Sequence, residues 1–202
     1  MGQRSQIYVR YNKQLVIANY YQWNYGERMI SRARYGLDYL TYYLKNGFCW
    51  AFTTKHTGDY EKIRRYFDVN FDYKDIVISS DLFKEWEEEK NSFENWTIND
   101  WVFEADNNDG RLFIDITFNE ETNEYTLKYC FTNCKNQNPL TPRQYMDWDY
   151  PGWKTSEYIE EDIKKATEDN LEFIEKNFTL MTQEELEDYL NTDYTPKERE
   201  EK

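Results

Sequence analysis

Residues 1–45 have the sequence MGQRSQIYVRYNKQLVIANYYQWNYGERMISRARYGLDYLTYYLK, and this stretch decides the fold. Apolar and polar side chains alternate over residues 6–11 and again over residues 14–19, which predicts two strands. Asn12 and Lys13 between them suit a two-residue turn, so we expect a β-hairpin.

Residues 26–45 are predicted to form a long amphipathic helix. Apolar side chains recur there at alternating steps of three and four residues, which places them in one continuous stripe. A polar stripe lies opposite, and Asn46-Gly47 provides a stop signal at the carboxyl end. The apolar stripe consists of Ile30, Ala33, Leu37, Leu40 and Leu44.

The remainder of the chain contains a second set of strands followed by helices. Residues 100–132 are predicted to form a three-stranded β-meander over residues 101–105, 112–118 and 125–131, with turns at 106–110 and 119–123. Four shorter elements are expected before it: a strand over 48–53, a helix over 60–67, a strand over 75–79 and an acidic helix that ends near residue 90.

After the meander we expect a helical turn over residues 142–148 and a helix over residues 157–177. A capping box at Thr182–Glu185 begins a last helix that runs to Leu190, and the charged tail over residues 191–202 should be disordered. The sequence therefore predicts one α+β domain over residues 1–190. Its antiparallel sheet combines the hairpin and the meander, and the 26–45 and 157–177 helices cover it.

The charge is large and unevenly distributed. The chain has 25 Lys and Arg against 39 Asp and Glu, a net charge of −14. Residues 1–60 hold eight basic and three acidic residues, a net charge of +5, so the remainder carries −19. Such a chain repels nucleic acid as a whole and favours a basic protein partner, whereas the simplest alternative is that the charge only keeps it soluble.

The chain has three cysteines, which is an odd number. Its first residues are polar and basic and do not resemble a secretory signal. This pattern favours reduced thiols in a cytoplasm. No apolar run approaches the roughly 18 residues that a membrane span needs, so no membrane association is expected.

Catalytic and metal-binding motifs are not apparent. His56 is the one histidine, and Cys130 and Cys134 lack the second ligand pair of a structural zinc site. The turn at residues 106–110 places Ala105 and Ile116 where a calcium loop requires Asp and Glu. We therefore expect no catalytic residue, cofactor or metal. An unrecognised enzyme that uses carboxylates and a metal is an alternative, although no carboxylate pair stands out.

Two acidic and aromatic segments, residues 145–153 and the helix that starts at residue 157, suit a protein partner. Tyr and Trp are frequent interface anchors, and carboxylates along a rigid helix can imitate a row of phosphates in a basic groove. The alternative is that the rings close the core and the carboxylates form a solvated helix face. The candidate partner-binding residues are Tyr145, Asp147, Trp148, Asp149, Tyr150, Trp153, Glu157, Glu160, Glu161 and Glu168.

A second candidate surface is the basic amino-terminal face, where arginines could contact phosphates while a tyrosine stacks on bases. The alternative is that these arginines pair with carboxylates elsewhere in the chain. The candidate nucleic-acid-binding residues are Arg4, Arg10, Arg28, Arg32 and Tyr35.

The opening Gly2-Gln3-Arg4-Ser5-Gln6-Ile7-Tyr8-Val9-Arg10 resembles the start of small, poorly characterised proteins from phages and prophages of Gram-positive bacteria. The resemblance spans less than a quarter of the chain and implies a phage-type setting, in which small acidic proteins often resemble host-takeover or anti-defence factors, including DNA mimics and anti-CRISPR inhibitors. We expect a non-enzymatic protein that inhibits a nucleic-acid-handling host or defence protein in the bacterial cytoplasm. An immunity protein against a toxin nuclease is a related alternative.

Overall fold

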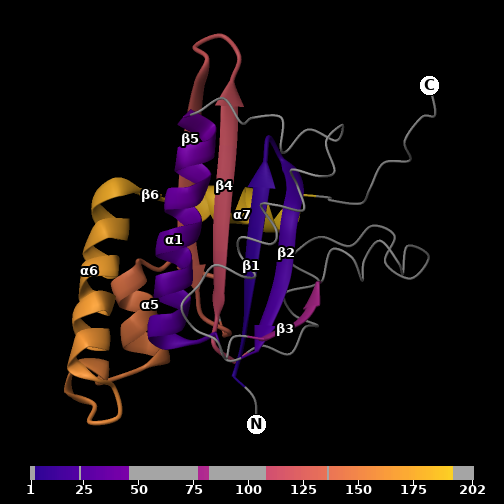
Figure 1. Ribbon diagram of the computed structural model, residues 1–202. Coiled ribbons are helices and arrows are strands. Elements are labelled where there is room, and N and C mark those ends of the chain that lie inside the picture. Colours follow the sequence, from indigo (N-terminus) through magenta and orange to yellow (C-terminus); the bar gives the residue numbers. More distant parts are fainter. Residues whose placement is uncertain (1–2, 23, 46–76, 82–107, 136, 193–202) are drawn as a thin grey trace.

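The computed structural model describes residues 3–22, 24–45, 77–81, 108–135 and 137–192, which form an α+β structure in three layers (Figure 1). A sheet lies in the middle, with α1, α5 and α6 on one face and α7 on the other. The strands are β1 (Arg4–Tyr11), β2 (Gln14–Gln22), β3 (Val77–Asp81), β4 (Arg111–Asn119), β5 (Glu124–Thr132) and β6 (Thr179–Leu180). The helices are α1 (Gly26–Lys45), α5 (Pro142–Asp149), the 3-10 helix η2 (Trp153–Thr155), α6 (Glu161–Asn177) and α7 (Gln183–Asn191).

The sheet is mixed, so the prediction of an antiparallel sheet was wrong. Its strand order is β3-β2-β1-β4-β5-β6, in which β1 runs parallel to β4 and β5 runs parallel to β6, while the other pairs are antiparallel. Parallel neighbours need a long crossover connection, and Arg10 and the opposing Asp115 are 105 residues apart in the sequence. That separation is why local alternation could not reveal which strands are neighbours.

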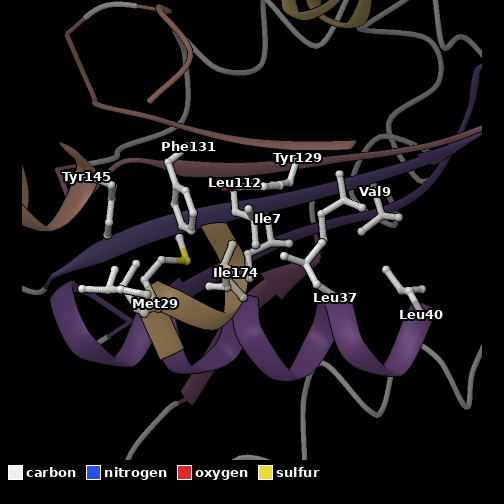
Figure 2. Packing of buried hydrophobic residues seen from close by; sticks show 14 of the residues in the cluster. Ile7, Val9, Met29, Leu37, Leu40, Leu112, Tyr129, Phe131, Tyr145 and Ile174 are labelled. Carbon is white, nitrogen blue, oxygen red and sulfur yellow. The ribbon is translucent and has the colours of Figure 1, made fainter. Parts of the chain in front are cut away.

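The face of the sheet under α1 holds the larger core. All five predicted stripe residues of α1 are buried, which confirms the helix and its apolar face. Figure 2 shows Leu37 and Leu40 pointing toward Ile7, Val9 and the neighbouring strands. α6 adds Leu171 and Ile174 to the same cluster, and α5 adds Tyr145 and Met146. Burying several side chains of this size stabilises the fold by about 1.5–3 kcal/mol each.

The opposite face holds a smaller core beneath α7. Tyr8 of β1 stacks on Phe113 of β4 with ring centroids 5.1 Å apart, and Tyr189 of α7 meets Phe113 edge-on at 5.3 Å. β1 is consequently buried on both faces from Ser5 to Tyr11, as is usual for a central strand with a parallel neighbour. α7 begins with the predicted capping box, in which Thr182 accepts from the Glu185 N–H and Glu185 accepts from the Thr182 N–H.

Several predicted elements fall outside the described residues: the strands over 48–53 and 101–105, the helices over 60–67 and 81–90, and nearly all of the tail. Within the described residues, the predicted strand over 75–79 corresponds to β3, and two strands of the predicted meander correspond to β4 and β5. The predicted helix over 157–177 begins later, at Glu161, because residues 157–159 form a turn and a bend and the N-cap residue Glu160 has an extended backbone.

Gly110 provides a test of the packing where β4 begins. Its φ is +81°, and an added Cβ would overlap the Thr132 carbonyl oxygen and crowd Tyr145. We expect Gly110→Ala to lower the free energy of unfolding by about 3 kcal/mol, from left-handed backbone strain plus steric overlap. Urea unfolding measures this. Gly152→Ala is the matched control, because Gly152 has a φ of +77° but a Cβ added there would lie 3.7 Å from its nearest neighbour, the Thr155 hydroxyl. This variant should lower the free energy of unfolding by only about 1 kcal/mol. Equal losses in the two variants would contradict the packing argument.

Candidate interaction surface

The arginines of the amino-terminal region do not form one basic face. Arg10 is 3 % exposed and faces α7, whereas Arg32 is 1 % exposed and lies 4.3 Å over the ring of Tyr21, which belongs to the α1 side of the sheet. The sheet therefore separates them. Arg28 is half-buried near the ring of Tyr25 at 5.4 Å.

Arg10 is neutralised within the molecule. Its Nε donates to Asp115 Oδ1 at 2.7 Å, and its Nη2 donates to Asp115 Oδ2 and to Asp188 Oδ2, each at 2.9 Å. The guanidinium also lies 4.4 Å from the ring centroid of Tyr189. Partial burial opposes ionisation of Asp188, but hydrogen bonds from Arg10 and Lys13 hold the pKa of its carboxyl below the ordinary value. These contacts join β1, β4 and α7.

Arg4, and Arg34 beside the candidate Tyr35, also make contacts within the molecule. The Arg4 backbone N–H donates to Asn108 and Asp109 at the start of β4. Arg34 pairs with Asp38 at 3.1 Å and lies over the ring of Phe173 in α6. Tyr35 is 41 % exposed, so it is the most accessible of the five residues predicted to bind nucleic acid.

The aromatic segment over residues 145–153 belongs largely to the core. Tyr145 is fully buried and stacks on Phe131 at 4.9 Å, and Trp153 is 3 % exposed. Trp148 and Tyr150 are half-buried, and Asp147 is exposed. Two of the predicted anchors, Tyr145 and Trp153, are thus inaccessible to a partner in this structure, because their rings fill the space between α5, α6 and the sheet.

The predicted carboxylates divide into two groups. Glu168 connects three elements, since its Oε1 lies 2.5 Å from Arg143 Nη1 of α5 and its Oε2 lies 3.0 Å from Lys154 Nζ of η2. Glu157, Glu160 and Glu161 are exposed on the approach to α6. Glu161 contacts Lys164 at 2.6 Å, whereas Glu157 and Glu160 form no ion pair with any residue that the structure describes.

Residues 157–162, called here the acidic segment, carry one side chain that the sequence analysis did not select. Tyr158 is 96 % exposed, with Glu157, Glu160, Glu161 and Asp162 around it in the sequence. Its backbone is held by buried Ile159 on one side and by the Ser156 hydroxyl, which accepts from the Tyr158 N–H at 3.3 Å. The sequence signal that could have identified it is one aromatic residue, Tyr158, among four acidic residues and next to the apolar Ile159.

A second group missed by the sequence analysis is a buried carboxylate cluster at the start of α1, formed by Asp109, Asp149 and Tyr145. Asp149 Oδ2 accepts from the first N–H of α1, at Gly26, at 2.7 Å and from the Tyr145 hydroxyl at 3.1 Å. The same hydroxyl donates to the Asp109 carbonyl at 2.7 Å, and the Asp109 carboxylate accepts from the Arg4 N–H. The cluster thus ties β1, the start of β4, α1 and α5 together.

Burial dominates the electrostatics of this carboxylate cluster. Desolvation, together with the nearby Asp149, raises the pKa of Asp109 from 3.8 to about 7. Desolvation raises the pKa of Asp149 to about 6, and the charge of Glu27 adds to the effect. Both carboxyls therefore take up protons more readily in the folded chain than in the unfolded chain.

No family model, curated protein or solved structure matches the chain. The phage-type resemblance accordingly stays a prediction. Among the described residues, no group of three or more His, Cys, Asp or Glu side chains could hold a metal ion. No helix in the same part of the chain has the length and apolar character to cross a membrane.

Arg10→Met tests whether the buried guanidinium serves the fold. The substitution leaves Asp115 and Asp188 without their central cation, so we expect the free energy of unfolding to fall by about 3 kcal/mol. Lys13→Met removes the other cation on Asp188, but Lys13 is 69 % exposed and should contribute less than about 0.5 kcal/mol. Chemical denaturation of both variants is the measurement, and a tolerant Arg10→Met protein would indicate that Arg10 is free for another role.

Asp149→Asn tests the carboxylate cluster. Because the folded-state pKa values of Asp109 and Asp149 are raised, their contribution to stability is present below about pH 4 and is lost as the pH rises through 6 to 7. We expect Asp149→Asn, which keeps an oxygen acceptor, to raise the free energy of unfolding at pH 8 by about 2 kcal/mol and to change it little at pH 4.

Urea titrations between pH 4 and pH 8 provide this measurement. Asp147→Asn, at an exposed position of the same helix, is the matched control and should leave the pH dependence unchanged. A gain for Asp149→Asn that is the same at both pH values would show that burial of the ionised carboxylate is not its cause.

Proposed function

We propose that the protein is a non-enzymatic binding protein whose acidic segment docks on a basic, nucleic-acid-handling host or defence protein and inhibits it. The observation that carries this proposal is a contrast in exposure. Arg10 and Arg32 are buried inside the molecule, whereas Glu157, Glu160 and Asp162 face solvent without an ion pair to any described residue. These three carboxylates of the acidic segment are thus presented outward.

The composition around the acidic segment supports a basic partner. Residues 137–192 contain fourteen Asp and Glu against five Lys and Arg, a net charge of −9. A concentrated negative surface accelerates association with a basic groove and disfavours acidic or nucleic-acid partners. Tyr158 adds a large ring that a partner pocket can bury, and interfaces often depend on such a residue.

The biological setting rests on the amino-terminal resemblance. A phage-type protein that acts in the cytoplasm of a bacterial host would meet nucleic-acid-binding defence proteins, whose grooves are basic because they hold phosphates. An immunity protein that neutralises a toxin nuclease would use the same surface chemistry, and its gene would lie beside that of the nuclease. Direct nucleic-acid binding is less well supported, because the basic residues it requires are divided between the two faces of the sheet.

Neutralising the acidic segment tests the proposal. The triple variant Glu157→Gln, Glu160→Gln and Asp162→Asn should lose at least tenfold in retention of a basic nucleic-acid-binding protein from bacterial host lysate. Retention by the unaltered chain should also weaken as salt rises from 0.1 to 0.5 M, since screening shortens the reach of exposed charges. Affinity capture with mass spectrometry identifies what is retained.

The matched control replaces Glu120, Glu121 and Glu124 by Gln. These three exposed carboxylates lie around the β4–β5 turn, at the opposite end of the molecule from the start of α6 (Figure 1). The control changes the net charge equally and should keep the partner. The proposal fails if both triple variants behave alike, or if no basic nucleic-acid-binding protein is retained by the unaltered chain.

A further inference from the structure

The connection between η2 and α6 presents one tyrosine to solvent. This connection lies at one end of the molecule (Figure 1), and the side chain of Tyr158 within it is 96 % exposed. Tyr35 and Tyr42 also have exposed rings, but both belong to α1, where helical hydrogen bonds fix the backbone. Tyr158 is the one described tyrosine that combines an exposed ring with a backbone outside the helices and strands.

The hydroxyl of Tyr158 is accessible as well as its ring. It makes no hydrogen bond with any residue that the structure describes. The neighbouring hydroxyls are engaged: Thr155 Oγ1 donates to the Gly152 carbonyl at 3.1 Å. Ser156 Oγ accepts from the Tyr158 N–H at 3.3 Å and lies 3.4 Å from the Tyr150 hydroxyl. A group attached to the Tyr158 hydroxyl therefore displaces no contact, whereas one attached to Thr155 or Ser156 does.

The backbone around Tyr158 is anchored but not locked. Residues 157–159 form a turn and a bend, and Ser156 and Glu160 on either side have extended backbones. Buried Ile159 fixes the connection to the core. The Tyr158 N–H donates to a side chain, the Ser156 hydroxyl, and not to a carbonyl of a helix or strand. Such a segment opens locally at little cost, so it can enter the cleft of a modifying enzyme.

The charge around Tyr158 indicates which kind of enzyme fits. Four exposed carboxylates lie within four residues of it, at Glu157, Glu160, Glu161 and Asp162. Glu157 and Glu160 form no ion pair with any described residue, so their charge is available to an approaching protein. A basic groove attracts such a segment and orients it. The flanking sequence therefore favours an enzyme that acts on tyrosine and has a basic substrate groove.

We propose that Tyr158 is a phosphorylation site for a tyrosine kinase with a basic substrate groove. The kinase transfers the γ-phosphoryl group of a nucleoside triphosphate to the Tyr158 hydroxyl. The bond from Oη to phosphorus forms while the bond from the γ-phosphorus to the β,γ-bridging oxygen breaks. The nucleoside diphosphate leaves, and the hydroxyl proton passes to a carboxylate of the kinase.

The modification changes the charge of the acidic segment. A phosphate on Tyr158 adds about −1.5 to −2 charge at pH 7. The added charge strengthens the attraction between this segment and a basic partner. This consequence rests on the proposed function, whereas the modification itself does not, because its test requires no retained partner.

The site is tested by incubating the full chain with bacterial host lysate, Mg²⁺ and ATP labelled in the γ-phosphate. The lysates used are those that phosphorylate a copolymer of glutamate and tyrosine, so that a tyrosine kinase directed to acidic substrates is present. Label should enter the peptide that contains Tyr158, as identified by mass spectrometry. An unlabelled chain in such a lysate overturns the proposal. Label that enters from the α-phosphate instead marks nucleotidyl transfer and overturns the assignment to phosphoryl transfer.

Tyr158→Phe identifies the acceptor atom. This variant keeps the ring and removes only an exposed hydroxyl, so it should lose the label and keep the Tm of the unaltered chain. Tyr42→Phe is the matched control, because Tyr42 is 64 % exposed on α1, and it should be labelled as well as the unaltered chain. Undiminished labelling of Tyr158→Phe overturns the site.

The two triple variants described above test the basic groove. The variant neutralised at residues 157, 160 and 162 should incorporate phosphate about tenfold more slowly, since three exposed charge contacts with the kinase are lost. The variant neutralised at residues 120, 121 and 124 should keep the rate of the unaltered chain. Equal rates in the two variants overturn the assignment to a kinase with a basic groove.

Discussion

The parallel pairing of β1 with β4 is the contact on which the rest of the structure depends. It joins the β1–β2 hairpin to the β4–β5 hairpin and places both strands in the centre of one sheet. Central strands expose side chains to both layers, so each face of the sheet must be covered. α1 covers one face with an apolar stripe, and α7 covers the other through Tyr189 and Leu186. The burial of Arg10 follows from this arrangement, because β1 has no solvent-facing side.

Local patterns predicted the elements better than their arrangement. The hairpin, the stripe of α1, the β4–β5 pair and the capping box of α7 all depend on residues close in the sequence, and the structure contains each of them. The β1–β4 pairing depends on residues about a hundred positions apart, and no short-range periodicity encodes it. Tyr8 and Arg10 illustrate the consequence. Alternation assigned them to a polar face, although that face is buried beneath α7.

The candidate sites were predictable to a lesser degree. Exposure of Glu157, Glu160 and Glu161 matches the expectation of an acidic surface, because carboxylates rarely lie inside without partners. Tyr145 and Trp153 could not be assigned from composition, since an aromatic ring suits a core and an interface equally well. The cluster of Asp109 with Asp149 was invisible in the sequence, because it forms only when α5 packs against the start of β4.

The long sequence separation between β1 and β4 also bears on synthesis of the chain. The β1–β2 hairpin and α1 leave the ribosome first, while the strand that pairs with the other edge of β1 begins at Arg111. At about 5–20 residues per second, that edge waits roughly 5–20 s for its neighbour. An unpaired strand edge is a template for association with other chains. Nascent chains of this protein consequently pass through an interval in which one edge of β1 is open to neighbouring chains on the same polysome.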